Sequence, residues 1–293
     1  MNDYILAVSS TADLRREYLE EHGIPFISYT YTVGEEVFSD DCREETRQQL
    51  YADMRGGKRL HTSMINAHGY YEFLKPLCES GKPVLFLDMS REMSSSYRNS
   101  LMGADMVREE VPGCTLVVLD TRCISGGLGL LVKELVERKE TGMDFDELVA
   151  FAEEEKLHIA HRFTVDDLNY LKAGGRVSNA AALVGSILSV KPVLYVPDGG
   201  TLDVVSKVRG RKAALAAITD GIRRDLSEID CTGAEVDILH ADCLSDAEKV
   251  RDELLSAFPQ LGRVEISSLG VIIGAHCGPG LLTVFYRCAK RTP

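Results

Sequence analysis

The stretch that decides most about this chain is NYLKAGGRVS at residues 169–178, which runs directly into NAAALVGSIL at residues 179–188. The pair Gly174 and Gly175 permits a close backbone turn, with φ of either sign, just before Arg176. The chain then becomes almost wholly small and apolar as far as KPVL at residues 191–194. A polar turn that leads into an apolar wall suits a long apolar molecule with a polar head. The structural alternative is a helix C-cap followed by an ordinary buried helix.

On the N-terminal side of this stretch, predicted strands and helices alternate along the chain. Apolar and β-branched runs predict strands at residues 4–8, 24–32, 83–88 and 115–120. Helices are predicted at residues 66–80, 94–102 and 125–138. Ser10 or Thr11 is expected to cap a further helix, with Asp13 in its first turn. The alternation predicts a layered α/β domain built on a parallel sheet.

The regular alternation of predicted strands and helices ends after an acidic helix predicted at residues 143–156. Strands are predicted at residues 159–165, 190–196, 201–207, 264–268, 270–273 and 282–286, and helices at 166–172, 210–226 and 245–258. The sequence PDGG at residues 197–200 is a strong hairpin signal. This half therefore predicts an α+β domain with a mixed or antiparallel sheet. We place the boundary so that the domains are residues 1–157 and 158–293, with the site at their interface.

The composition sets the class of protein. Of 293 residues, 45% are hydrophobic and 27% are charged, which is typical of a globular chain. The net charge of -12 argues against nucleic acid as a partner. No apolar run reaches the length of a membrane span, so we expect no stable membrane insertion. Eight cysteines without a CxxC pair, and no secretory-signal pattern at the N-terminus, lead us to expect a cytoplasmic monomer.

Several further motifs follow the same order as those of a known family. They are VSSTADL at residues 8–14, TS at 62–63, MSSSY at 93–97, KVRGRK at 207–212 and GAHCGPG at 274–280. Together with LKAGGRVS they resemble the DegV family, bacterial fatty-acid-binding proteins that include the binding subunits of fatty acid kinase. The resemblance covers essentially the whole chain. It implies a DegV-like fold, a long-chain fatty acid as ligand with no other cofactor, and an ATP-dependent fatty acid kinase as a possible partner.

Thr62 and Ser63 are candidate head-group ligands. Two hydroxyls where a loop is predicted to enter a helix are equally consistent with helix capping. In the family the corresponding residues continue with QP followed by Ser or Thr, whereas this chain continues with Met64-Ile65-Asn66. The resemblance therefore carries over the hydroxyl role but neither the loop shape nor the acyl-chain selectivity.

Ser94 and Ser95 occupy the place of the family's LSGTY motif. Ser94 matches the head-group serine of that motif, and Ser95 replaces its glycine. The structural alternative is a helix N-cap. Both roles are compatible, because a helix N-terminus presents free N–H groups that favour an anion.

His276 lies between Gly274 and the GPG sequence at residues 278–280, where we predict a junction between a strand and a turn. A histidine framed by glycines and a proline is less typical of a core than of a functional loop, although a structural role stays open. The resemblance implies that this histidine lines the head-group region and faces the hydroxyls. Cys277 is expected to be a small buried filler.

Two basic features have two possible roles each. Arg176, beside Gly175, could pair with an anion or stabilise the Gly-Gly turn, and both residues are candidate ligand-binding positions. Lys207, Arg209 and Arg211 form a compact basic cluster on an acidic protein. This basic cluster is either a solvated helix start or a docking patch for an acidic kinase surface.

The chemistry that these residues favour is binding rather than catalysis. The alternative is a lipid esterase with Ser94 as nucleophile and His276 as base. However, the chain has no GxSxG motif and no acidic residue that stands out as a third member. It also lacks a phosphate-binding GxxxxGK[ST] loop, a GxGxxG dinucleotide motif and an obvious metal-binding carboxylate cluster. The sequence therefore predicts a non-enzymatic lipid carrier.

Overall fold

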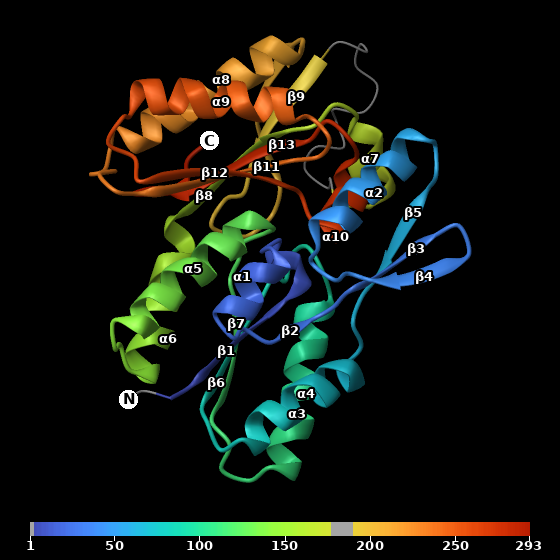
Figure 1. The fold of residues 1–293 in the computed structure, drawn as a ribbon, viewed down its shortest axis with the longest axis vertical. Helices are drawn as coiled ribbons and strands as arrows, with labels where there is room; N and C mark the ends of the chain where they lie inside the picture. Colours follow the sequence, from blue (N-terminus) through green and yellow to red (C-terminus); the bar gives the residue numbers. More distant parts are fainter. Residues whose placement is uncertain (1–2, 177–189) are drawn as a thin grey trace.

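A parallel sheet organises the N-terminal half of the protein (Figure 1). The computed structural model describes residues 3–176 and 190–293. Four strands lie in the order β2-β1-β6-β7, and all neighbours are parallel. They are β1 (Ile5–Ser9), β2 (Phe26–Ile27), β6 (Val84–Asp88) and β7 (Leu116–Asp120). The central strand β6 is buried along its whole length, as expected for a parallel strand that is covered on both faces.

Alternate residues of β6 contact different helices. Val84 and Phe86 pack with α3 (Ala67–Glu79) and α4 (Ser96–Glu110) in one apolar cluster. Leu85 and Leu87 belong to a second cluster with α1 (Arg16–Glu21), α5 (Gly126–Glu140) and α6 (Phe145–Glu155). The period of two therefore divides the helices into a layer on each side of the sheet.

A mixed six-stranded sheet organises the C-terminal half, in the order β10-β9-β8-β13-β11-β12. Its strands are β8 (Ile159–Thr164), β9 (Val190–Tyr195), β10 (Asp203–Arg209), β11 (Glu235–His240), β12 (Arg263–Ser268) and β13 (Leu282–Arg287). Only the β11–β12 pairing within it is parallel among the described strands. Helices α8 (Arg211–Leu226) and α9 (Leu244–Ala257) cover one face (Figure 1). The predicted α/β and α+β fold class is confirmed.

Helix α5 lies between the two large sheets. Its N-terminal glycines allow close approach: a Cβ on Gly126 would lie 2.7 Å from the Phe285 ring on β13, and one on Gly129 would lie 2.6 Å from the Ala12 carbonyl oxygen. A Cβ on Gly127 would overlap the His161 ring on β8. Two strands of the C-terminal half and the turn that follows β1 thus meet the same end of α5.

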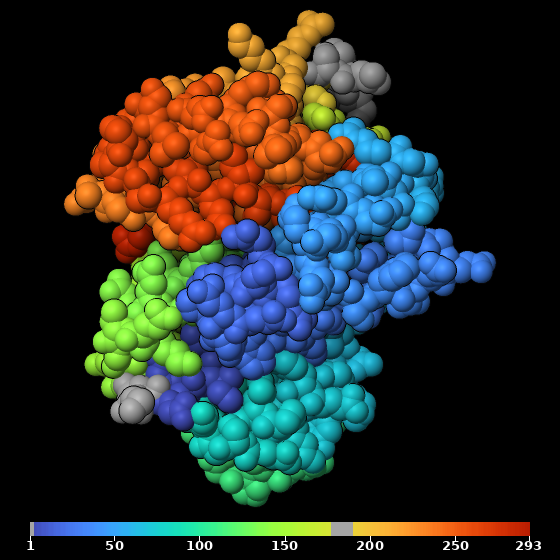
Figure 2. Space-filling view, viewed as in Figure 1, coloured from blue at the N-terminus to red at the C-terminus, as the bar shows by residue number. Residues whose placement is uncertain are grey.

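A small antiparallel sheet, in the order β4-β3-β5, was not predicted. It consists of β3 (Thr30–Val33), β4 (Glu36–Ser39) and β5 (Leu60–Ser63). The β3–β4 hairpin projects from the body of the molecule (Figure 2). Helix α2 (Glu44–Arg55), also not predicted, follows β4. The single strand predicted at residues 24–32 was therefore wrong, because the chain leaves the parallel sheet after Ile27 and enters this second sheet at Thr30.

Two other local predictions were wrong. Ser10 and Thr11 do not cap a helix; they lie in the 3-10 turn η1 (Ser10–Ala12), and Asp13 follows with φ 54°. Residues 270–273 are not a strand, because Val271–Cys277 form helix α10. The β-branched residues of α10 suggest a strand by propensity, but packing against α2, β5 and helix α7 (Leu168–Ala173) overrides that preference.

The predicted hairpin and the predicted domain boundary have different outcomes: the first is confirmed and the second is untested. β9 and β10 are antiparallel and flank residues 197–200, so the hairpin is confirmed. The boundary near residue 158 stays a prediction; a 3-10 turn, η2 (Lys156–His158), immediately precedes β8 there. Within residues 3–176 and 190–293, no helix is both long and apolar enough to cross a membrane.

The contact at Gly127 gives a test of the fold. We expect Gly127→Ala to destabilise the protein by about 1–3 kcal/mol or more, because the new methyl group overlaps the fully enclosed His161 ring. Gly199→Ala is the matched control, since a Cβ there meets no atom within 4 Å. Urea denaturation compares the free energies of unfolding. Equal values for the two variants would contradict the packing described here.

Candidate functional site

A cavity of about 860 Å³ lies where the carboxyl ends of the parallel strands face the mixed sheet. Such crevices are where ligands bind in open α/β sheets. Its wall is mostly apolar, with Met89, Phe163, Leu202, Leu281 and Phe285 among the lining side chains. The chemistry of this wall therefore suits an apolar molecule.

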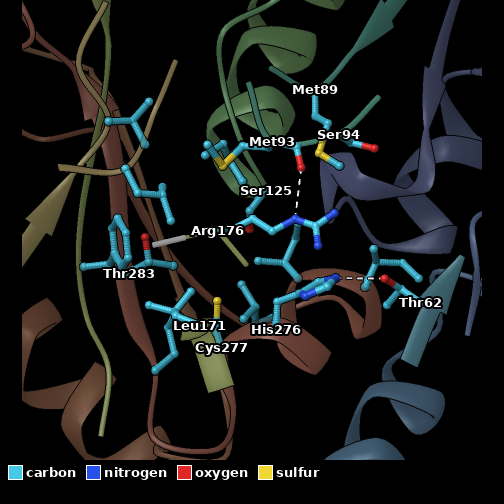
Figure 3. Close-up of a pocket in the computed structure, with 18 of the residues that line it drawn as sticks. Thr62, Met89, Met93, Ser94, Ser125, Leu171, Arg176, His276, Cys277 and Thr283 are labelled. Carbon is cyan, nitrogen blue, oxygen red and sulfur yellow. Dashed lines mark hydrogen bonds between the residues drawn. The ribbon is translucent and has the colours of Figure 1, made fainter. Parts of the chain in front are cut away.

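One end of the cavity is polar. Thr62, Ser63, Ser94, Arg176 and His276, all predicted as ligand-binding residues, line it. Thr62 Oγ1 on β5 lies 2.8 Å from His276 Nε2 on α10, although 214 residues separate them (Figure 3). Thr62 and Ser63 are the last residues of a strand, and not part of a helix-entering loop as predicted. His276 lies in the last turn of α10, and not at the predicted strand end.

His276 is neutral at physiological pH. Burial, and secondarily the charge of Arg176, lowers the pKa of His276 from 6.5 to about 4. A neutral imidazole has one donor and one acceptor nitrogen. Nε2 is bonded to Thr62. His276 therefore contributes hydrogen bonding rather than positive charge to this end of the cavity.

The adjacent glycines Gly174 and Gly175 have different structural roles. Gly175 has φ +71°, a left-handed conformation that favours glycine, and a Cβ there would meet no atom within 4 Å. At Gly174 a Cβ would lie 2.5 Å from His276 Nδ1. The first glycine thus makes room for the histidine, and the second turns the chain. Gly175 is not among the residues that line the cavity.

Arg176 has the structural role considered for it, and its role in pairing with an anion stays a prediction. Its Nε donates to the Met93 carbonyl at 3.2 Å, and its Nη1 donates to the Gly174 carbonyl. These bonds tie the end of α7 to the loop that carries Ser94. Figure 3 shows the guanidinium between the Ser94 side and the His276 side of the cavity. It is the cation that lines this cavity in the described residues.

Ser94 lines the cavity, whereas Ser95 does not. The helix N-cap considered as the structural alternative lies at Ser95, at the start of α4, and the Ser95 side chain makes no capping bond. Ser94 Oγ instead accepts a hydrogen bond from the Ser96 backbone N–H at 3.2 Å. Its hydroxyl hydrogen is left to donate toward a ligand.

Within residues 3–176 and 190–293, no hydrogen bond joins Ser94 to His276, and no carboxylate bonds His276. An esterase would need a base within hydrogen-bond reach of the nucleophile and a group that orients the base. The described side chains at this end of the cavity do not form that arrangement.

Sequence reasoning missed several polar lining residues: Tyr29, Ser125, His161 and Thr283. Ser125 Oγ donates to Asp13 Oδ2 at 2.5 Å, and burial raises the pKa of Asp13 to about 7. His161 accepts from the Ile124 N–H at 3.0 Å, and burial lowers its pKa well below 6.5. Tyr29, His161 and Thr283 lie within predicted strands and Ser125 begins a predicted helix, so their sequence context resembled that of structural positions.

The basic cluster lies away from the cavity lining. Lys207 and Arg209 are exposed at the end of β10. Arg211 instead pairs with Asp246 at 2.9 Å and donates to the Gly280 carbonyl at 2.7 Å. Arg211 is thus held by intramolecular contacts, and the docking role of the cluster stays a prediction. The apolar segment predicted as a wall, residues 179–188, lies outside the described residues together with Ser178.

Comparison with known proteins gives consistent results in sequence and in structure. The family model described as "Uncharacterised protein, DegV family" matches residues 6–288. A DegV domain-containing protein of Clostridium perfringens is 31% identical over 294 residues, covering 100% of both chains.

Two solved structures have a similar fold. A fatty-acid-binding DegV family protein from Thermus thermophilus has a TM-score of 0.87 at 24% identity, covering 97% of this chain and 99% of the other. A stearic acid-binding protein from Eubacterium ventriosum has a TM-score of 0.87 at 23% identity, covering 97% and 98%. With a family match over nearly its whole length and a relative above 30% identity, this chain belongs to the DegV family.

Proposed function

We propose that this protein binds a long-chain fatty acid in the cavity and presents its carboxylate to a separate ATP-dependent kinase, which converts it to an acyl phosphate. The observation that carries the proposal is the combination of a long apolar wall with one polar end around Thr62 and His276. Two proteins of similar fold, from Thermus thermophilus and Eubacterium ventriosum, are described as binding fatty acids, which supports this ligand class.

The apolar wall supplies the affinity in this proposal. Burying a sixteen-carbon tail is worth roughly 0.8 kcal/mol per methylene, or about 12 kcal/mol in total. The loss of translational and rotational freedom on association costs about 4–15 kcal/mol, which offsets much of this gain. Hydrogen bonds at the polar end therefore add to the affinity as well as orienting the head group.

The polar end suits a head group whose chemistry has to change. The hydroxyls of Thr62 and Ser94 and the neutral His276 can bond both a carboxylate and an acyl phosphate. Arg176, at the same end of the cavity, complements the negative charge of either species. In this proposal the chain is a cytoplasmic, non-catalytic carrier, and exposed Lys207 and Arg209 contribute to kinase docking.

The test begins with native mass spectrometry of the purified protein, followed by lipid extraction and identification. A bound species of fatty-acid mass, lost on denaturation, would support the carrier and name its preferred chain. Delipidated protein that takes up no fatty acid, but cleaves a chromogenic ester in a Ser94-dependent way, would replace the proposal with a hydrolase. The kinase step is tested by acyl phosphate formation from the loaded protein, ATP and a purified fatty acid kinase; none formed would refute that step.

Removing head-group hydroxyls should weaken binding without unfolding the protein. We expect Thr62→Ala and Ser94→Ala each to weaken fatty acid affinity by about tenfold, the effect of one hydrogen bond to a charged group of roughly 1.5 kcal/mol. Isothermal titration calorimetry on delipidated protein measures the change. Thr32→Ala on the neighbouring strand β3 is the control, because the Thr32 hydroxyl bonds the His61 carbonyl and does not line the cavity. An equal loss in the control would contradict the assignment.

Arg176 should influence both the ligand and His276. Because its charge lowers the pKa of His276, we expect Arg176→Gln to move that pKa upward from about 4. An imidazole is charged below its pKa. In the variant, His276 should therefore become protonated at a higher pH than in the wild type. NMR titration of the His276 ring follows it. The same variant should lose preference for a fatty acid over the corresponding alcohol, while Arg209→Gln should change neither quantity.

A further inference from the structure

Tyr29, between β2 and β3, is a cavity residue with a hydroxyl that nothing in the described chain satisfies. Its side chain lines the cavity and is 2% exposed. The hydroxyl has no hydrogen-bond partner within residues 3–176 and 190–293. The Tyr29 backbone is held on both sides, since its N–H donates to Ser10 Oγ at 3.1 Å and its carbonyl accepts from the Asp40 N–H at 2.8 Å. The phenol is therefore fixed at its place in the wall.

The neighbouring polar groups already have partners. The hydroxyls of Ser94, Ser96 and Tyr70 lie close enough to the Tyr29 hydroxyl to influence its pKa, but none of them meets it in hydrogen-bond geometry. Ser94 Oγ accepts from the Ser96 N–H, and Ser96 Oγ accepts from the Ile65 N–H at 3.3 Å. Tyr70 donates to Asp88 Oδ2 at 3.0 Å. Each of these neighbouring hydroxyls thus makes a hydrogen bond to another group and none to Tyr29.

The position of Tyr29 places its hydroxyl at the polar end of the cavity. Thr30 pairs with Ser63, and Tyr31 pairs with Thr62, across the β3–β5 ladder. Tyr29 is therefore the next residue beyond the pairing that carries the two candidate head-group hydroxyls. Ser94 lies beside it, in the loop that links β6 to α4.

A buried hydroxyl without a partner is unfavourable unless a ligand supplies one. Burial, and then the nearby Asp88, raises the pKa of Tyr29, so the phenol keeps its proton and acts as a donor. The best acceptor for a desolvated donor is a charged oxygen. A carboxylate has two such oxygens with several lone-pair sites, enough for Tyr29 and Ser94 together.

We propose that the Tyr29 hydroxyl donates a hydrogen bond to the carboxylate of the bound ligand, next to Ser94, and thereby selects fatty acids over uncharged long-chain lipids. This inference rests on the proposed function. It adds a ligand-contacting residue from the link between β2 and β3 to those on β5, α10 and the loops after β6 and α7.

The test compares Tyr29→Phe with the wild type, both delipidated, in titrations with palmitate and with hexadecanol. We expect the variant to bind palmitate about tenfold more weakly and hexadecanol with little change. Its melting temperature without ligand should equal or exceed that of the wild type, because the substitution removes an unsatisfied buried hydroxyl. The melting-temperature gain on adding palmitate should shrink.

Tyr4→Phe is the matched control, since the Tyr4 hydroxyl donates to the Met143 carbonyl at 3.0 Å and is not part of the cavity lining. It should leave palmitate binding unchanged. Two results would show that the Tyr29 hydroxyl is structural: unchanged palmitate affinity in Tyr29→Phe, or a variant less stable than the wild type without ligand. Either result would overturn this inference and leave the proposed function untouched. A wild type that binds no palmitate would overturn the proposed function together with the inference.

Discussion

The close packing of the α5 N-terminus between the two large sheets is the constraint on which the rest of the structure depends. Gly126 contacts β13, Gly127 contacts β8, and Gly129 contacts the turn after β1. A side chain at any of these positions would clash with its neighbour, so the neighbour or the helix would have to shift. The glycines let the backbone of α5 approach both halves of the molecule closely. The carboxyl ends of the parallel strands therefore face the mixed sheet, and the cavity lies between them.

The polar end of the cavity depends on that arrangement, since each of its residues comes from a different segment. Thr62 is on β5, Ser94 follows β6, Arg176 follows α7 and His276 ends α10. Burial keeps His276 uncharged, so positive charge enters only through Arg176 among the described lining residues. The result is a polar end that is rich in hydroxyl groups and has Arg176 as its single cation among the described lining residues.

Sequence patterns predicted the elements that packing and local propensity both favour. The apolar strands at 84–88 and 116–120 and the helix at 126–140 lie close to their predicted positions. The pattern failed where the two conflict: Val271, Ile272 and Ile273 have strand propensity but fold as α10. It also missed Tyr29, because an aromatic residue in an apolar run has the same sequence signature whether it fills a core or lines a cavity.

By itself, the sequence determined the family motifs, the alternation of strands and helices, and the need for glycine where the chain turns after α7. These are local properties, because φ preference and side-chain periodicity act over a few residues. Only the tertiary structure decided that Thr62 meets His276, that Gly174 rather than Gly175 makes room for that histidine, and that Arg211 is held by Asp246. Hydrogen-bond partners, burial and pKa values arise from groups far apart in the chain, which no local pattern encodes.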